Sequence, residues 1–147
     1  MGIFSRDSSK EIRRLAEVRG LSTENSVTKF DCFSLPRLDE ALNAFPSATV
    51  FSSLDFAMAF HHVPVKLSDI EKTAFITHVG QFEMQKMPLG VCNAPSTYQW
   101  LMAGVLQGLI GRICLAYLDD VIVCSKKRSE HAADLCSVFY RIRSAGL

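Results

Sequence analysis

The sequence predicts a layered α+β fold. Residues 1–26 differ from the rest of the chain. After them, the apolar pattern predicts a helix, a strand, a β-hairpin, a long helix, a second hairpin and a final helix. The chain has 147 residues, of which 48% are hydrophobic, so it is long enough to bury a sizeable core as one domain. Strands and helices in such a mixed order are typical of sheets covered by helices.

The boundaries of the elements follow from proline, glycine and capping residues. Pro36 and Pro95 stand where a helix favours proline, at its first turn. Ser129 is expected to cap the last helix and Gly146 to end it. The predicted elements are a helix at residues 10–19, a polar linker at 21–26, a helix at 36–45, a strand at 48–54, an extended piece at 62–67, a polar turn at 68–72, a hairpin at 73–87, a helix at 95–110, strands at 113–118 and 121–125, and a helix from 129 to 146.

The composition excludes several classes of protein. Lys and Arg number 16 against 15 Asp and Glu, which argues against binding to nucleic acid through bulk charge but leaves a local basic patch possible. The five cysteines and four histidines show neither a closed disulfide framework nor zinc-ligand spacing, as is typical of a reducing compartment. The longest apolar stretch, residues 100–110, is far shorter than the roughly 20 residues that span a membrane. We therefore expect an intracellular protein, in cytoplasm or nucleus, with no membrane partner.

Two adjacent carboxylates, Asp119 and Asp120, lie between the last two apolar strands and are expected to form a tight hairpin turn. Like charges about 4 Å apart repel by about 4 kcal/mol at an effective dielectric of 20. Such a pair is therefore either turned into water or neutralised by a cation. The simpler interpretation is that Asp is a common turn residue, and for an isolated pair that interpretation is favoured.

A third carboxylate, Asp55, ends the buried strand at residues 48–54 and is followed at once by an apolar run. A carboxylate in such a place is unfavourable unless it is paired or binds a metal. If this strand lies beside the Asp119 hairpin, three carboxylates converge, and a set of oxygen ligands of this kind suits Mg²⁺ or Mn²⁺. The alternative for Asp55 is an ordinary helix N-cap.

Six short motifs then occur in a fixed order. They are Phe51-Ser52-Ser53-Leu54-Asp55, His61-His62-Val63-Pro64, Lys72-Thr73-Ala74-Phe75, Met87-Pro88-Leu89-Gly90, Asn93-Ala94-Pro95-Ser96-Thr97-Tyr98-Gln99 and Tyr117-Leu118-Asp119-Asp120. Together they resemble the reverse transcriptase of gypsy-type LTR retrotransposons. The resemblance covers residues 27–147, and it is the order and spacing of all six motifs that make it specific.

The resemblance implies a fingers–palm fold, with an antiparallel palm sheet backed by helices. It also implies two Mg²⁺ (or Mn²⁺) ions held by Asp55 and Asp119, with Asp120 completing the carboxylate set. Such ions lower the pKa of a primer 3′-hydroxyl and stabilise the leaving pyrophosphate. The implied activity is that of an RNA-directed DNA polymerase, which adds deoxynucleotides from dNTP to a primer on an RNA or DNA template.

The resemblance further assigns residues to the nucleotide and the primer. The backbone of Phe56 and Ala57 would face the triphosphate, and Phe60 would select deoxyribose, although from the residues alone Phe60 is a plain core aromatic. Leu89 lies where the incoming nucleotide is contacted and has the apolar character usual in the gypsy type. Tyr117 would pack under the primer terminus.

Some positions depart from the family pattern. Ser53 stands where the family often has Lys, and segment 1–26 shows none of its motifs and receives no function. Residues 27–147 are expected to be a partial domain that ends before the primer grip and thumb. An alternative to the polymerase therefore stays open at this stage: a non-catalytic remnant of such an element with at most residual nucleic-acid binding.

Overall fold

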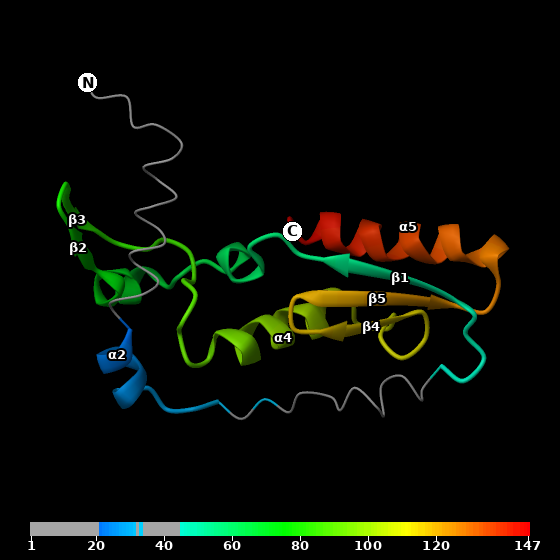
Figure 1. Ribbon diagram of the computed structural model, residues 1–147, viewed down its shortest axis with the longest axis horizontal. Coiled ribbons are helices and arrows are strands. Elements are labelled where there is room, and N and C mark those ends of the chain that lie inside the picture. The colour runs from blue at the N-terminus through cyan, green and yellow to red at the C-terminus, as the bar shows by residue number, and fades with distance from the viewer. Residues whose placement is uncertain (1–20, 32, 34–44) are drawn as a thin grey trace, which may run out of the picture. The chain divides into compact units, whose positions relative to one another are not determined.

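The chain forms two compact units, each built from two separate stretches of sequence (Figure 1). A computed structural model describes residues 21–31, 33 and 45–147. The first unit comprises Met1–Phe30 and Phe60–Ala94, and the second comprises Asp31–Ala59 and Pro95–Leu147. The helices predicted at residues 10–19 and 36–45 lie outside the described residues.

The second unit contains a three-stranded antiparallel sheet with the strand order β1-β5-β4. Its strands are β1 (Val50–Asp55), β5 (Asp120–Ser125) and β4 (Cys114–Tyr117). The register of β1 and β5 runs from Val50 opposite Ser125 to Asp55 opposite Asp120. The structure thus confirms the predicted strand before Asp55 and the predicted β4–β5 hairpin.

The turn of that hairpin lies one residue earlier than the sequence predicts. Tyr117 pairs with Asp120, so the two loop residues are Leu118 and Asp119, and Asp120 is the first residue of β5. Leu118 has a φ of +52°. A two-residue hairpin loop needs a positive φ to match the twist of its strands, and here a leucine adopts it without the help of glycine.

The two faces of this sheet differ in their burial. Along β1 the even-numbered residues from Val50 to Leu54 are half-buried, whereas Phe51, Ser53 and Asp55 are exposed. The more buried face meets the last helix, α5 (Arg128–Ser144), which lies along the sheet in Figure 1. Because the helix covers that face, the carboxylate of Asp55 is left on the more open one.

Helix α5 begins slightly differently from the prediction and ends as predicted. Its N-cap is Lys127, without a side-chain cap, and Ser129 is already the second helical residue, so Ser129 does not cap it. At the other end Gly146 has a φ of +76°, and its N–H donates to the carbonyl of Arg143. The glycine therefore ends the helix in the left-handed conformation that only glycine adopts freely.

Helix α4 (Ala94–Val105) contributes two of the largest fully buried side chains of the second unit, Tyr98 and Met102. The two are four residues apart, the spacing that places side chains on one face of a helix, and Leu106, directly after the helix, is fully buried as well. The helix is shorter than the predicted 95–110, because the chain turns at Gly108, whose φ is +80°, and at Gly111, whose φ is +78°.

The first unit contains the second hairpin. Strands β2 (Phe75–Thr77) and β3 (Gly80–Phe82) confirm the predicted hairpin over a shorter span, and the rings of Phe75 and Phe82 stack across it. A helix, α2 (Ser22–Val27), stands where the sequence predicts a linker. Its Asn25 side chain donates to the carbonyl of Gly90 and accepts the N–H of Cys92, so a long-range contact accompanies this helix.

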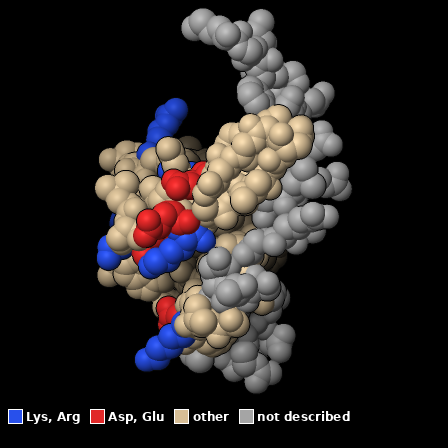
Figure 2. All heavy atoms as spheres, turned by 90° about the vertical axis from the view of Figure 1, so that its left-hand side faces the viewer, with Lys and Arg blue, Asp and Glu red and all other residues tan. Residues whose placement is uncertain are grey.

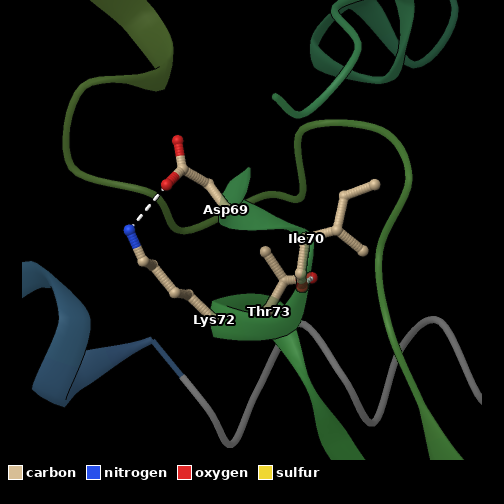
Figure 3. Close-up of polar contacts among 4 residues, drawn as sticks. All are labelled: Asp69, Ile70, Lys72 and Thr73. Carbon is tan, nitrogen blue, oxygen red and sulfur yellow. Dashed lines mark hydrogen bonds and ion pairs between the residues drawn. The ribbon is translucent and has the colours of Figure 1, made fainter. Parts of the chain in front are cut away.

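Two short 3₁₀ helices complete the first unit. They are η1 (Ala59–His62), whose first residue belongs to the second unit, and η2 (Leu67–Thr73). In η2 the Thr73 hydroxyl donates to the carbonyl of Ile70, and Lys72 forms an exposed ion pair with Asp69 at 2.6 Å (Figure 3). Thr73 also accepts the N–H of Met84, so η2 is tied to the segment after β3.

The polar turn predicted at 68–72 is therefore a 3₁₀ helix. The extended piece predicted at 62–67 is confirmed only around residue 64, which forms a β-bridge with residue 86. Residue 62 ends η1 and residue 67 begins η2. None of the helices that the structure describes is long and apolar enough to cross a membrane.

Candidate active site

Two carboxylates lie directly opposite each other at one end of the sheet in the second unit. Asp55 is the last residue of β1 and Asp120 the first of β5, and the two are paired in the register. Residues paired in this way point to the same face with Cβ atoms about 5 Å apart, and like charges there are destabilising. Asp119 precedes Asp120 in the hairpin loop. This end of the sheet therefore gathers negative charge at the expense of stability.

The hairpin loop is held by hydrogen bonds from both sides. The N–H of Phe56, just after β1, donates to the carbonyl of Asp119 at 3.1 Å. On the other side, the N–H of Leu118 donates to the side-chain oxygen of Gln99 in α4 at 2.7 Å. A left-handed φ at a residue other than glycine costs about 1–2 kcal/mol, and these bonds offset that cost.

A buried tyrosine lies beneath the loop. Tyr98 is fully buried in α4, and its ring meets that of Phe56 edge to face with 6.2 Å between centroids. Burial, and after it the negative charge of Asp119, raises the pKa of the Tyr98 hydroxyl to about 12. Tyr98 is therefore protonated at neutral pH, and Asp119 lies near enough for its charge to act on that hydroxyl.

Two of the three carboxylates are open to solvent. Asp55 and Asp120 are exposed, as is Ala57, whereas Asp119 and Tyr117 are half-buried. Carboxylate oxygens that water reaches are the ligands that Mg²⁺ and Mn²⁺ prefer, so the chemistry of the donors fits a divalent ion. Among the residues that the structure describes, however, no three His, Cys, Asp or Glu side chains are gathered into a ready metal-binding group.

The structure brings together only some of the residues expected at the site. Asp55, Asp119 and Asp120 share one end of the sheet with Tyr117, which pairs with Asp120, and with Phe56. The other nucleotide-contacting candidates, Phe60 and Leu89, belong to the first unit. Leu89 is 43% exposed there.

The sequence alone did not indicate a function for Gln99. This residue lies within one of the six motifs, yet its hydrogen bonds, one to Ala116 in β4 and one to Leu118 in the loop, are visible only in the folded chain. A signal was present in retrospect: a glutamine between two aromatic residues, followed by an apolar run, needs a polar partner if the helix buries it.

The charged side chains on the face shown in Figure 2 give no further indication of a site. On the face shown in Figure 2, basic and acidic side chains of the described residues are interspersed, so that face carries no continuous patch of one sign. This agrees with the net charge of +1 of the whole chain.

Comparison with known proteins points to one family. The family model for reverse transcriptase (RNA-dependent DNA polymerase) matches residues 8–147, which includes most of segment 1–26. The Pol polyprotein of transposon 297 from Drosophila melanogaster is 37% identical over 123 residues, which are 84% of this chain and 12% of that protein. The Pol polyprotein of transposon opus from the same organism is 33% identical over 141 residues, 96% of this chain and 14% of the relative.

Solved structures share the fold. The prototype foamy virus protease-reverse transcriptase matches with a TM-score of 0.75 at 20% identity, over 85% of this chain and 17% of that one. The foamy viral enzyme in complex with an RNA/DNA hybrid gives a TM-score of 0.71, also at 20% identity, over 86% and 17%. At this identity the match establishes the fold alone. The fold is thus the α+β architecture of reverse transcriptases, as the sequence predicts.

The chain spans only 12% and 14% of the length of the two Pol relatives. The motifs, the fold and the family match agree: this chain belongs to the reverse transcriptase (RNA-dependent DNA polymerase) family, with retrotransposon Pol polyproteins among its relatives.

Proposed function

We propose that this chain carries the catalytic carboxylates of an RNA-directed DNA polymerase and acts by two-metal nucleotidyl transfer. The observation that carries the proposal is the register of β1 and β5, which sets Asp55 opposite Asp120 beside the loop residue Asp119. Three carboxylates at one end of a sheet repel each other. Divalent cations bound between these carboxylates would offset that repulsion.

Asp55 and Asp119 are the proposed ligands of two Mg²⁺ or Mn²⁺ ions, and Asp120 completes the carboxylate set. When bound, these ions would lower the pKa of the primer 3′-hydroxyl and offset the charge of the leaving pyrophosphate. The carboxylates are adjacent but not gathered into a metal-binding group. Binding would therefore require rotations of the side chains between staggered rotamers.

The remaining proposed contacts divide between substrate and primer. The backbone of Phe56 and Ala57 would face the triphosphate of the dNTP, and Tyr117 would pack under the primer terminus. Phe60 would select the deoxyribose of the incoming nucleotide, and Leu89 would contact that nucleotide. The proposed partner is a primer on an RNA or DNA template, supported by the foamy viral relative, which has been solved with an RNA/DNA hybrid and with double-stranded DNA.

Primer extension on an RNA template with Mg²⁺ tests the proposal. The purified chain is compared with Asp119→Asn and with Glu130→Gln, a matched neutralisation of an exposed carboxylate in the first turn of α5. We expect the wild type and Glu130→Gln to extend the primer alike. Asp119→Asn is expected to lose on the order of a hundredfold or more in rate, because it removes charge stabilisation at the reacting centre.

Two other outcomes would count against the proposal. Equal extension by all three proteins would mean that Asp119 is not a catalytic residue. No extension by a wild-type chain shown to be folded would favour the alternative of a non-catalytic remnant, and binding of a primer–template duplex by that chain would then measure any residual nucleic-acid contact.

A further inference from the structure

We infer that Gln99 is a positioning residue, whose side-chain amide fixes the backbone of the loop that carries Asp119. The catalytic consequence of this inference rests on the function proposed above, whereas the structural part does not. Gln99 lies in α4 and is only 4% exposed, and its side-chain amide bonds backbone groups of Ala116 and Leu118. It is therefore argued to act through the loop.

The side-chain amide of Gln99 makes hydrogen bonds at the outer side of β4, of the kind that a further strand would make. Among the residues that the structure describes, strand β4 is at the edge of the sheet, so no further strand of that part of the chain pairs with its outer side. The side-chain amide nitrogen, Nε2, donates to the carbonyl of Ala116 at 3.0 Å, and the amide oxygen, Oε1, accepts the N–H of Leu118 at 2.7 Å. One amide thus satisfies two backbone groups that are two residues apart, as a paired strand would.

The second of these bonds acts on the strained residue of the loop. Leu118 has a φ of +52°, in the left-handed region that leucine rarely adopts. The N–H of Leu118 donates to the side chain of Gln99. One residue later, the carbonyl of Asp119 accepts the N–H of Phe56. The peptide unit before Leu118 and the one after Asp119 are therefore both fixed. The backbone between them, which sets the direction of the Asp119 carboxylate, has little freedom left.

A simpler account is that Gln99 only satisfies an open sheet edge. The two accounts differ in what happens when the amide is replaced by an apolar group of the same length. Gln99→Met keeps an unbranched side chain of similar size and removes both hydrogen bonds. Gln107→Met makes the same change at an exposed glutamine just beyond α4 and is the matched control.

The first measurement is amide hydrogen exchange by NMR on the ¹⁵N-labelled chain. We expect the Leu118 amide to exchange on the order of tenfold faster in Gln99→Met, since it loses one hydrogen bond, while the amides of β5 keep their protection. Gln107→Met should match the wild type. Gln99→Glu keeps an oxygen for the Leu118 N–H, so its Leu118 exchange should lie nearer to wild type than that of Gln99→Met. An unchanged Leu118 amide in Gln99→Met would overturn the inference.

The second measurement separates positioning from edge protection. In a chain that extends a primer, Gln99→Met should lower kcat while KM for the dNTP stays within about twofold, because an interaction that matters in the transition state has been lost. An unchanged kcat together with a faster Leu118 amide would reduce Gln99 to an edge-protecting residue and overturn its positioning role. A faster Leu118 amide in a chain whose wild type extends no primer would leave the loop contact standing and reject the proposed polymerase instead.

Discussion

Two residues other than glycine, among those that the structure describes, adopt a positive φ, and both lie close to the carboxylates in sequence. Leu118 precedes Asp119 with a φ of +52°, and Met58 follows Asp55 by three residues with a φ of +57°. Leu118 is half-buried and held by Gln99, whereas Met58 is 54% exposed in a turn. The unfavourable backbone at Met58 is therefore not offset by burial of its side chain.

Glycine substitutions at neighbouring positions should consequently have opposite effects on stability. Met58→Gly removes the left-handed penalty and is expected to raise the free energy of unfolding by about 0.5–1 kcal/mol, after the added freedom of the unfolded chain is subtracted. Ala57→Gly, one residue earlier and without a positive φ, adds only that freedom and should lower it by about 0.4–1 kcal/mol. Urea denaturation measures the change in the free energy of unfolding for each variant. A lower free energy of unfolding in Met58→Gly would show that the left-handed backbone at Met58 is not strained.

The convergence of Asp55 with Asp119 and Asp120 could be predicted from the sequence, but the exact turn could not. Each of these carboxylates adjoins an apolar strand pattern, so the pairing of the two strands brings them to one end of the sheet. The turn lies one residue earlier than predicted because apolar alternation does not say which of Leu118 and Asp120 pairs across the hairpin. Gln99 was not identified, since its partners lie 17 and 19 residues away and only the folded chain brings them together.

At the scale of the elements, a buried polar network joins α5 to the sheet. The Ser125 hydroxyl, at the end of β5, donates to the carboxylate of Asp134 and lies 2.8 Å from Nδ1 of His131. Nε2 of His131 lies 2.8 Å from the hydroxyl of Ser52 in β1. Because Ser125 has only one hydrogen to donate, Nδ1 of His131 must carry a proton, and in the neutral ring Nε2 accepts from Ser52. The imidazole thus ties two strands to one helix.

Ser125→Ala tests this network. The substitution leaves the buried Nδ1–H of His131 without that acceptor and removes the donor to Asp134, so we expect the free energy of unfolding to fall by about 1–3 kcal/mol. Ser129→Ala, at an exposed helical position that does not cap α5, should change it by less than about 0.5 kcal/mol. Equal unfolding midpoints for the two variants in urea would show that the network does not stabilise the docking of α5.

At the scale of the whole molecule, most of the core that the described residues form lies in the second unit. All of the largest fully buried side chains among the described residues belong to the second unit, among them Tyr98 and Cys114. The sequence predicts a single domain and did not reveal the division. Each unit is assembled from two separate stretches, so no shift of composition along the chain marks a boundary between them.

Two of those buried groups can ionise, and burial opposes their ionisation. Burial, and after it the nearby Cys124, raises the pKa of the Cys114 thiol from 9.0 to about 12. Burial and then Asp119 raise the pKa of Tyr98 from 10.0 to about 12. In both cases the folded chain holds a proton that the unfolded chain releases at lower pH. The stability that these groups contribute is therefore complete below pH 9.0 and 10.0 respectively, and it is lost as the pH rises toward 12.

The alkaline limb of the stability curve should therefore fall, and one hydroxyl should account for part of the fall. Each group that titrates only in the unfolded chain lowers the free energy of unfolding by about 1.4 kcal/mol per pH unit. Tyr98→Phe removes one such group, so between about pH 10 and pH 11 its stability should decline less steeply than that of the wild type. Tyr140→Phe, which removes an exposed hydroxyl from α5, should reproduce the wild-type curve. Urea unfolding followed by circular dichroism at several pH values gives these slopes, and a parallel decline in all three proteins would mean that Tyr98 ionises as easily in the folded chain as in the unfolded one.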